Sequence, residues 1–248
     1  QKHIILDVVG TCISFSTFIR RIETILGPRL RTHHTNAHIF SYAWMQASEL
    51  EYTMLLMSSR YTPYSEVFKT LFYRVLYMSG IENPREFATE DERDACQAAC
   101  SLLELRPGCR EMMEKLRGNG FEIWCLTTGD VARVSGYFVR EGVEMPVERV
   151  VSCVDFMEGG GGDRLGVVKP SMGAYRRIVE RLGLGEEDEM WFAAAHMWDV
   201  SAAVKAGFRG AYCSAYEKES RIEIFDTRMD VMADSLPEMA DKIIAMTS

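Results

Sequence analysis

Three features are missing from this 248-residue chain, and each absence argues against a class of protein. No apolar run reaches the ~18 residues that a membrane-spanning helix needs, so we expect no membrane partner. Acidic residues outnumber basic ones, 36 to 28, and without basic clusters we expect no nucleic-acid partner. The first residues enter an apolar strand directly, so we expect no signal peptide before it.

Cysteine occurs seven times, but never in the C-x-x-C spacing that is typical of zinc and redox sites. Cys96 and Cys100 are one helical turn apart, and Cys125 lies in an apolar strand-like run, so packing is the simpler explanation for all three. An odd number of cysteines without a disulfide pattern indicates a reducing compartment. We therefore expect a cytoplasmic protein without disulfides, metal or cofactor.

The periodicity of apolar residues indicates two kinds of region. After a buried strand at residues 4–6, helical spacing dominates the next 90 residues or so. Helices are expected at 15–26, 36–59, 64–80 and 89–104, with breaks at Gly27-Pro28, Thr62-Pro63 and Asn83-Pro84. This block is too long for an ordinary connection between two strands.

Strands and helices alternate in the rest of the chain. Strands are expected at 121–128, 147–154, 190–195 and 210–214, and the glycine run 159–162 predicts a loop. Alternation of this kind is typical of a parallel sheet with right-handed crossovers. We therefore predict an α/β fold: a Rossmann-like core of residues 1–13 and 106–248, with residues 14–105 inserted as an all-helical cap domain.

Polar side chains stand at the ends of the predicted strands or just before the helices that follow. In chain order they are Asp7 and Thr11, Thr127 and Thr128, Lys169, and Asp199. In an open α/β sheet, ligands bind beyond the carboxyl ends of the strands. A carboxylate, hydroxyls, an ammonium and a second acid at that edge indicate a catalytic site, with Asp7 as nucleophile or metal ligand. Position 9, two residues after Asp7, is a valine and not a second acid.

Four segments resemble, in order, the four motifs of the haloacid dehalogenase superfamily. They are residues 7–11, residues 126–129, Lys169-Pro170 with Tyr175, and residues 194–199. Residues 50–53 also resemble the cap of the 2-haloacid dehalogenase branch. The phosphatase branch has a general acid where this chain has Val9. Each motif is weak alone, but four in order at plausible spacing are specific.

The resemblance implies a metal-independent hydrolase in which Asp7 attacks a carbon and forms an aspartyl ester, which water then hydrolyses. Lys169 would keep Asp7 ionised. Asp199 would pair with Lys169 and help to orient the water. Contacts with the substrate would come from Thr11, Thr127, Thr128, Tyr175 and His196. On the cap, Trp44 belongs to an apolar helix face that is expected to be mostly core, and we expect Trp44 itself to line a pocket for the substrate.

One departure from the dehalogenase pattern concerns the substrate. Dehalogenases have a cap arginine a few residues before the segment that matches 50–53, but residues 44–47 here are Trp, Met, Gln and Ala. We therefore expect a small-molecule organic substrate, larger than a simple haloacid, bound between cap and core. The sequence is compatible with a homodimer. The alternatives are a lyase, dehydratase or cyclase on the same scaffold, a phosphatase, which Val9 disfavours, and an inactive binding protein.

Overall fold

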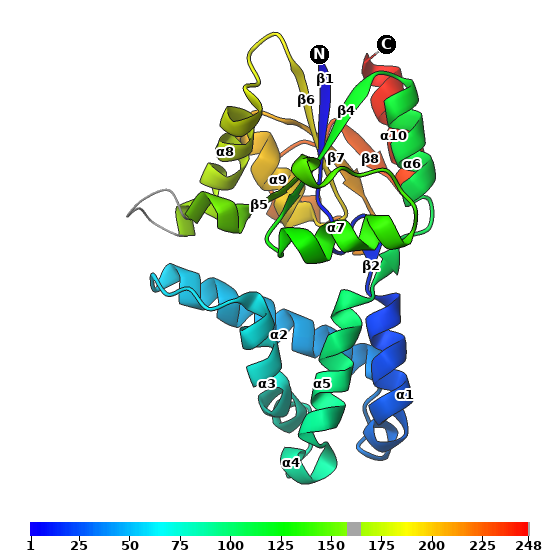
Figure 1. Ribbon diagram of the computed structural model, residues 1–248, viewed down its shortest axis with the longest axis vertical. Coiled ribbons are helices and arrows are strands. Elements are labelled where there is room, and N and C mark those ends of the chain that lie inside the picture. Colours follow the sequence, from blue (N-terminus) through cyan, green and yellow to red (C-terminus); the bar gives the residue numbers. More distant parts are fainter. Residues whose placement is uncertain (158–164, 248) are drawn as a thin grey trace. The chain divides into compact units, whose positions relative to one another are not determined.

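The computed structural model describes residues 1–157 and 165–247, and the predicted glycine loop at 159–162 lies outside the described residues. The chain divides into two compact units. One comprises Gln1–Ser14 and Leu105–Ser248, and contains a sheet with helices; the other comprises Phe15–Glu104 and is helical (Figure 1). The α/β fold class expected from the sequence is confirmed.

Six parallel strands form the main sheet, in the order β5-β4-β1-β6-β7-β8. They are β1 (Lys2–Leu6), β4 (Phe121–Thr127), β5 (Val150–Ser152), β6 (Glu189–Ala194), β7 (Arg209–Cys213) and β8 (Val231–Ala233). β1 is a central strand with neighbours on both sides, which explains its unbroken apolar run. Leu6 pairs with Cys125 of β4 and with Ala193 of β6, so these three strands end at one edge.

Five described helices of the same unit surround the sheet (Figure 1). They are α6 (Cys109–Gly118), α7 (Val131–Arg140), α8 (Met172–Leu182), α9 (Met197–Lys205) and α10 (Leu236–Thr247). α6 and α10 lie side by side, α8 packs with α9, and α7 contacts β5. The Ser171 hydroxyl caps the start of α8, which ends at Gly183 in the left-handed conformation that glycine adopts without strain.

Four short strands differ from the sequence-based expectations. The strand expected at 147–154 contains only the three residues of β5, because 3-10 turns occupy Val147–Arg149 and Cys153–Met157. β8 was not expected, since three residues are too few for a clear alternation. The same holds for β2 (Ile13–Ser14) and β3 (Glu104–Leu105), which pair with each other.

The second unit consists of helices joined by short loops. They are α1 (Ser16–Thr32), α2 (Ala37–Met57), α3 (Tyr64–Met78), α4 (Pro84–Phe87) and α5 (Glu90–Ala98), followed by a 3-10 turn at Ala99–Ser101. In the described part of the chain, no helix is both long and apolar enough to cross a membrane. α5 begins with a capping box, in which the Thr89 and Glu92 side chains each accept the other's backbone N–H.

The expected break at Gly27-Pro28 is wrong, because α1 continues through Pro28 to Thr32. A proline inside a helix costs roughly 3 kcal/mol, since it removes one hydrogen bond and crowds the preceding turn. The buried stripe of α1 nevertheless runs past the proline, and packing of this stripe offsets the cost. Its members are Phe18, Ile22, Leu26 and Leu30.

Trp44 lies in the core of the helical unit, where its ring is fully buried. The ring stacks on Phe68 with centroids 4.0 Å apart, and its Nε1–H donates to the Phe68 carbonyl at 2.6 Å. Phe72 packs edge-on against it at 4.9 Å. The expectation that Trp44 contacts the substrate is corrected here, because neighbours in its own unit cover the ring and satisfy its only donor.

We expect Trp44→Ala to lower the free energy of unfolding by about 3–5 kcal/mol, because it leaves a large cavity and removes the hydrogen bond to the Phe68 carbonyl. Tyr42→Ala, on the exposed side of the same helix, is the matched control and should change stability by less than about 0.5 kcal/mol. Urea unfolding of the full chain, followed by circular dichroism, measures both. Equal losses in the two variants would contradict a core role for Trp44.

Candidate active site

Asp7 directly follows β1, and three side chains contact its carboxylate. Its backbone N–H donates to the Ala193 carbonyl at 3.0 Å, which holds the residue at the edge of the sheet. Oδ1 accepts a hydrogen bond from Lys169 Nζ at 2.7 Å. Oδ2 accepts one from Thr11 Oγ1 at 2.6 Å, and Nδ1 of His196 lies 3.2 Å from the same oxygen. The carboxylate is therefore buried but well bonded.

Lys169 connects Asp7 to a second buried acid. Its Nζ donates to Oδ2 of Asp199 at 2.6 Å, and the Tyr175 hydroxyl donates to Oδ1 of Asp199 at 2.5 Å. Lys169 lies just before α8, Tyr175 within α8 and Asp199 within α9. All are buried. Residues that are far apart in the sequence thus form one continuous chain of hydrogen bonds.

The loop after β1 sets the direction of the Thr11 hydroxyl. Its oxygen accepts the Ala195 N–H at 2.8 Å, so its single hydrogen is directed to Asp7. The loop turns back tightly: Gly10 N–H donates to the Ile13 carbonyl at 2.8 Å. Gly10 has φ +95°, a conformation that residues with a Cβ rarely adopt. The turn that brings Thr11 back toward Asp7 therefore requires a glycine at this position.

Thr127 is the last residue of β4, Thr128 is the next residue along the chain, and their side chains have different surroundings. The buried Thr127 hydroxyl accepts the Gly129 N–H at 3.0 Å, which closes the turn after the strand. Thr128 is half-buried. The hydrogen bonds recorded for the described residues do not link either side chain to Asp7, so their contact with substrate stays a prediction.

The charges in this cluster depend on one another. Burial by itself would raise the pKa of Asp7, but the Lys169 ammonium and the bond to His196 hold that pKa below its ordinary value. Burial lowers the pKa of Lys169, yet Asp199 and Asp7 bring it above its ordinary value. Burial, followed by the charge of Asp7, raises the pKa of Asp199, and burial also raises that of the Tyr175 phenol. Asp7 and Lys169 are therefore both charged at neutral pH.

The pKa of His196 is raised by its contact with a buried carboxylate, as that of Lys169 is. Burial alone would lower it, but hydrogen bonding and attraction to Asp7 outweigh burial. Protonated His196 therefore stabilises the folded state fully below its unfolded pKa of ~6.5. This stabilisation is lost as the pH rises through the higher pKa of His196 in the folded state.

Sequence reasoning missed three residues around this cluster. The Tyr216 ring packs edge-on against the His196 ring at 5.0 Å. Glu217 Oε2 accepts the Met197 N–H, the first of α9, at 2.9 Å. Arg106 donates to carbonyls of the loop after β1. None of the three belongs to a recognised motif, and their roles depend on contacts between distant segments.

Residues 1–207 match the family model of the haloacid dehalogenase-like hydrolases. The chain belongs to this family. The resemblance inferred from the four motifs is confirmed, and so is the expectation of a hydrolase. No curated protein matches the chain in sequence.

Solved structures share the fold of this hydrolase at low identity. An L-2-haloacid dehalogenase from Xanthobacter autotrophicus is 18% identical with a TM-score of 0.73, over 98% of each chain. Another L-2-haloacid dehalogenase is 15% identical with a TM-score of 0.76, over 97% of each chain. The HAD-hydrolase YfnB from Bacillus subtilis, solved with magnesium, is 12% identical with a TM-score of 0.70, over 98% of each chain.

The side chains around Asp7 in this hydrolase do not fit magnesium, which prefers octahedral oxygen ligands. The Lys169 ammonium lies within 2.7 Å of Asp7 and 2.6 Å of Asp199, in the position where two acids would attract a cation. Val9 adds no side-chain oxygen. Within residues 1–157 and 165–247, no group of three or more His, Cys, Asp or Glu side chains could hold a metal ion.

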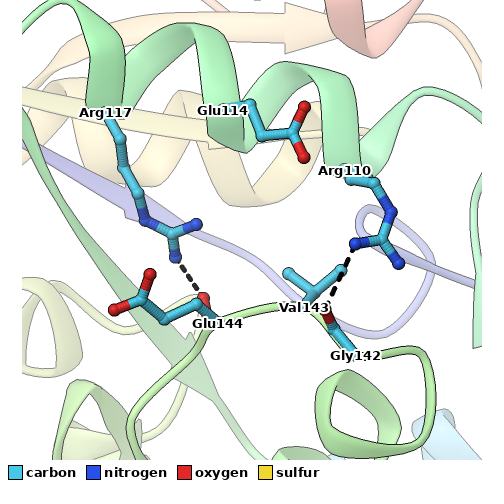
Figure 2. Close-up of a pocket in the computed structure, with 6 residues that line it drawn as sticks. All are labelled: Arg110, Glu114, Arg117, Gly142, Val143 and Glu144. Atoms are coloured by element: carbon cyan, nitrogen blue, oxygen red, sulfur yellow. Dashed lines mark hydrogen bonds between the residues drawn. The ribbon is translucent and has the colours of Figure 1, made fainter.

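A hollow of about 330 Å³ lies elsewhere in the hydrolase, between α6 and the loop after α7 (Figure 2). It is lined by Arg110, Glu114, Arg117, Gly142, Val143 and Glu144. Arg110 donates to the Gly142 carbonyl at 3.2 Å, and Arg117 donates to the Glu144 carbonyl. These guanidinium groups bind backbone carbonyls and thereby attach the loop to α6.

We expect Lys169→Met to cost about 3–5 kcal/mol of stability at pH 8, because it leaves two buried acids without their cation. Burial then raises the carboxyl pKa above its unfolded value, so the folded state binds a proton more tightly and the loss should shrink toward pH 5. Lys205→Met, which removes an exposed pair with Asp226, is the control and should change stability by less than about 0.5 kcal/mol. Urea unfolding at several pH values measures this, and a loss that does not depend on pH would contradict the argument.

Proposed function

We propose that this hydrolase is metal-independent and that Asp7 is its nucleophile, which forms an aspartyl ester with a small organic substrate. The observation that carries this proposal is the unequal bonding of the two Asp7 oxygens. Among the described residues, Oδ2 has contacts with Thr11 and His196, whereas Oδ1 accepts one hydrogen bond, from Lys169. A carboxylate oxygen has two acceptor positions, so Oδ1 retains one for attack.

In the first step, Oδ1 attacks a saturated carbon of the substrate. A carbon–oxygen bond forms, and the leaving group departs with the electrons of its bond to that carbon. Lys169 keeps Asp7 ionised for this attack, since a nearby positive charge favours the carboxylate. An L-2-haloacid dehalogenase of similar fold from Xanthobacter autotrophicus was solved with chloropropionic acid covalently bound, which supports a covalent step in the proposal.

In the second step, water attacks the Cγ carbon of the ester. Negative charge then develops on Oδ2, where the Thr11 hydroxyl and the Nδ1–H of His196 already lie at hydrogen-bond distance. With Nδ1 protonated, Nε2 of the neutral ring accepts the proton of the water and returns it to the departing alkoxide. The product alcohol retains the oxygen of Asp7, and the carboxylate gains the oxygen of water.

Asp199 acts through Lys169 in this proposal. Both of its oxygens hold donors, and its side chain is fully buried. It keeps the ammonium of Lys169 directed at Asp7 rather than contacting the water itself. This differs from the water-orienting role that the resemblance implies.

The substrate is proposed to be an organic molecule larger than a short haloacid. The L-2-haloacid dehalogenases of similar fold act on haloacids, as their names state. The cap arginine expected before residues 50–53 is absent here, so a short anionic substrate would lack a charge-assisted contact of roughly 1.5–3 kcal/mol.

We expect a covalent adduct on Asp7 when the protein is treated with 2-bromo acids and their neutral amides of increasing chain length. Intact mass and peptide mapping locate the adduct. His196→Gln should accumulate it, because the ester forms but is hydrolysed slowly, and Asp7→Asn should reduce its formation by roughly 10³-fold or more. Asp188→Asn, before the amino end of β6, is the control and should behave like the wild type. Adduct formation that survives Asp7→Asn would rule out this nucleophile.

We expect activity to persist in excess chelator and not to increase with magnesium, because Lys169 occupies the position of a cation. One panel measures halide release from 2-chloropropionate and from the longer bromo compounds, and phosphate release from an aryl phosphate, each with chelator or with magnesium. The short acid and the phosphate should both be poor substrates. Magnesium-stimulated phosphate release would instead favour a phosphatase.

A further inference from the structure

Arg106 binds the loop that carries Thr11. Its backbone N–H donates to the Cys12 carbonyl at 2.7 Å, its Nε to the Thr11 carbonyl at 2.9 Å, and its Nη2 to the Gly10 carbonyl at 2.6 Å. Three consecutive carbonyls of this loop therefore accept hydrogen bonds from one residue. The same loop begins at Asp7, which lies within this unit.

The other side of the guanidinium contacts the segment that packs against His196. Nη1 of Arg106 donates to the Ala215 carbonyl at 3.3 Å, and the guanidinium carbon lies 5.8 Å from the centre of the Tyr216 ring. Tyr216 in turn packs edge-on against His196. The neighbouring Glu217 accepts the first N–H of α9, next to His196. One side chain thus joins the loop of Thr11 to the support of His196.

This arrangement requires a guanidinium. Its planar fork donates in several directions at once, whereas an ammonium on a flexible stem is a point charge. Burial lowers the pKa of Arg106, but a guanidinium remains charged at every pH of interest. The side chain therefore brings both a fixed geometry and a positive charge to this region.

We propose that Arg106 is a positioning residue that holds the Thr11 hydroxyl and the His196 ring on the same oxygen of Asp7. The inference rests on the proposed function only in treating these two groups as donors to the reacting carboxylate. It adds a residue, outside all four motifs, on which the geometry of the site depends.

A measurement on His196 separates this role from a purely electrostatic one. Asp7, Asp199 and Lys169 act on the ring by charge, and Tyr216 packs against it. Glu217 and Arg106 are the charged groups on the neighbouring segments, where Glu217 accepts the Met197 N–H and Arg106 lies against Tyr216. Loss of a positive charge alone would raise the pKa of His196. Loss of positioning would loosen its contact with Asp7, and the pKa would fall toward its ordinary value of ~6.5.

The experiment is an NMR titration of the histidine ring signals in the wild type, Arg106→Met and Arg106→Lys, with His196→Gln to assign the signal. We expect the pKa of His196 to fall by about 0.5–1 pH unit in both Arg106 variants. Arg110→Met is the matched control, because Arg110 also donates to two backbone carbonyls, that of Glu141 and that of Gly142, the second of which Figure 2 shows. It should leave the pKa unchanged.

An unchanged or raised pKa of His196 in the Arg106 variants would overturn the proposal. So would a fall of equal size in Arg110→Met. Circular dichroism establishes which variants fold, and failure of both Arg106 variants to fold would assign the residue a structural role instead. Because the titration needs no substrate, its result is independent of whether Asp7 forms an adduct, so the two proposals can fail separately.

Discussion

The buried ammonium of Lys169 between two buried carboxylates is the interaction on which the rest of the site depends. Nζ lies 2.7 Å from Asp7 and 2.6 Å from Asp199, and all three side chains are almost fully removed from solvent. Charges buried in this way are tolerated only when they are paired and well hydrogen-bonded. The fold must therefore bring three places together in the core: the end of β1, the segment before α8, and the start of α9.

The same interaction limits the chemistry that the site can perform. An ammonium beside Asp7 favours its ionised form, which the proposed nucleophilic role requires, and the same ammonium lies between the two acids. Since Lys169 contacts Oδ1 while Thr11 and His196 contact Oδ2, the two oxygens of one carboxylate are chemically distinct. On this basis we propose that Oδ1 attacks the substrate and that Oδ2 carries the developing charge.

Sequence patterns predicted the fold where the local signal is strong and long. β1, β4 and β6 have apolar runs because their sheet is covered by helices, and the alternation of strand and helix indicated parallel pairing. The predictions failed where packing overrides local preference. α1 passes through Pro28 because its buried stripe continues, and Trp44 is a core residue because its own unit surrounds it.

The sequence by itself determined the kinds of residue at the site and their order along the chain, from Asp7 to Asp199, and these were sufficient to indicate the family. Only the tertiary structure decided which atoms meet. The contacts of Arg106 with Gly10 and with Ala215 join residues 96 and 109 positions apart. Periodicity encodes which face of an element is buried, but a hydrogen bond between distant loops depends on where the folded sheet places their ends.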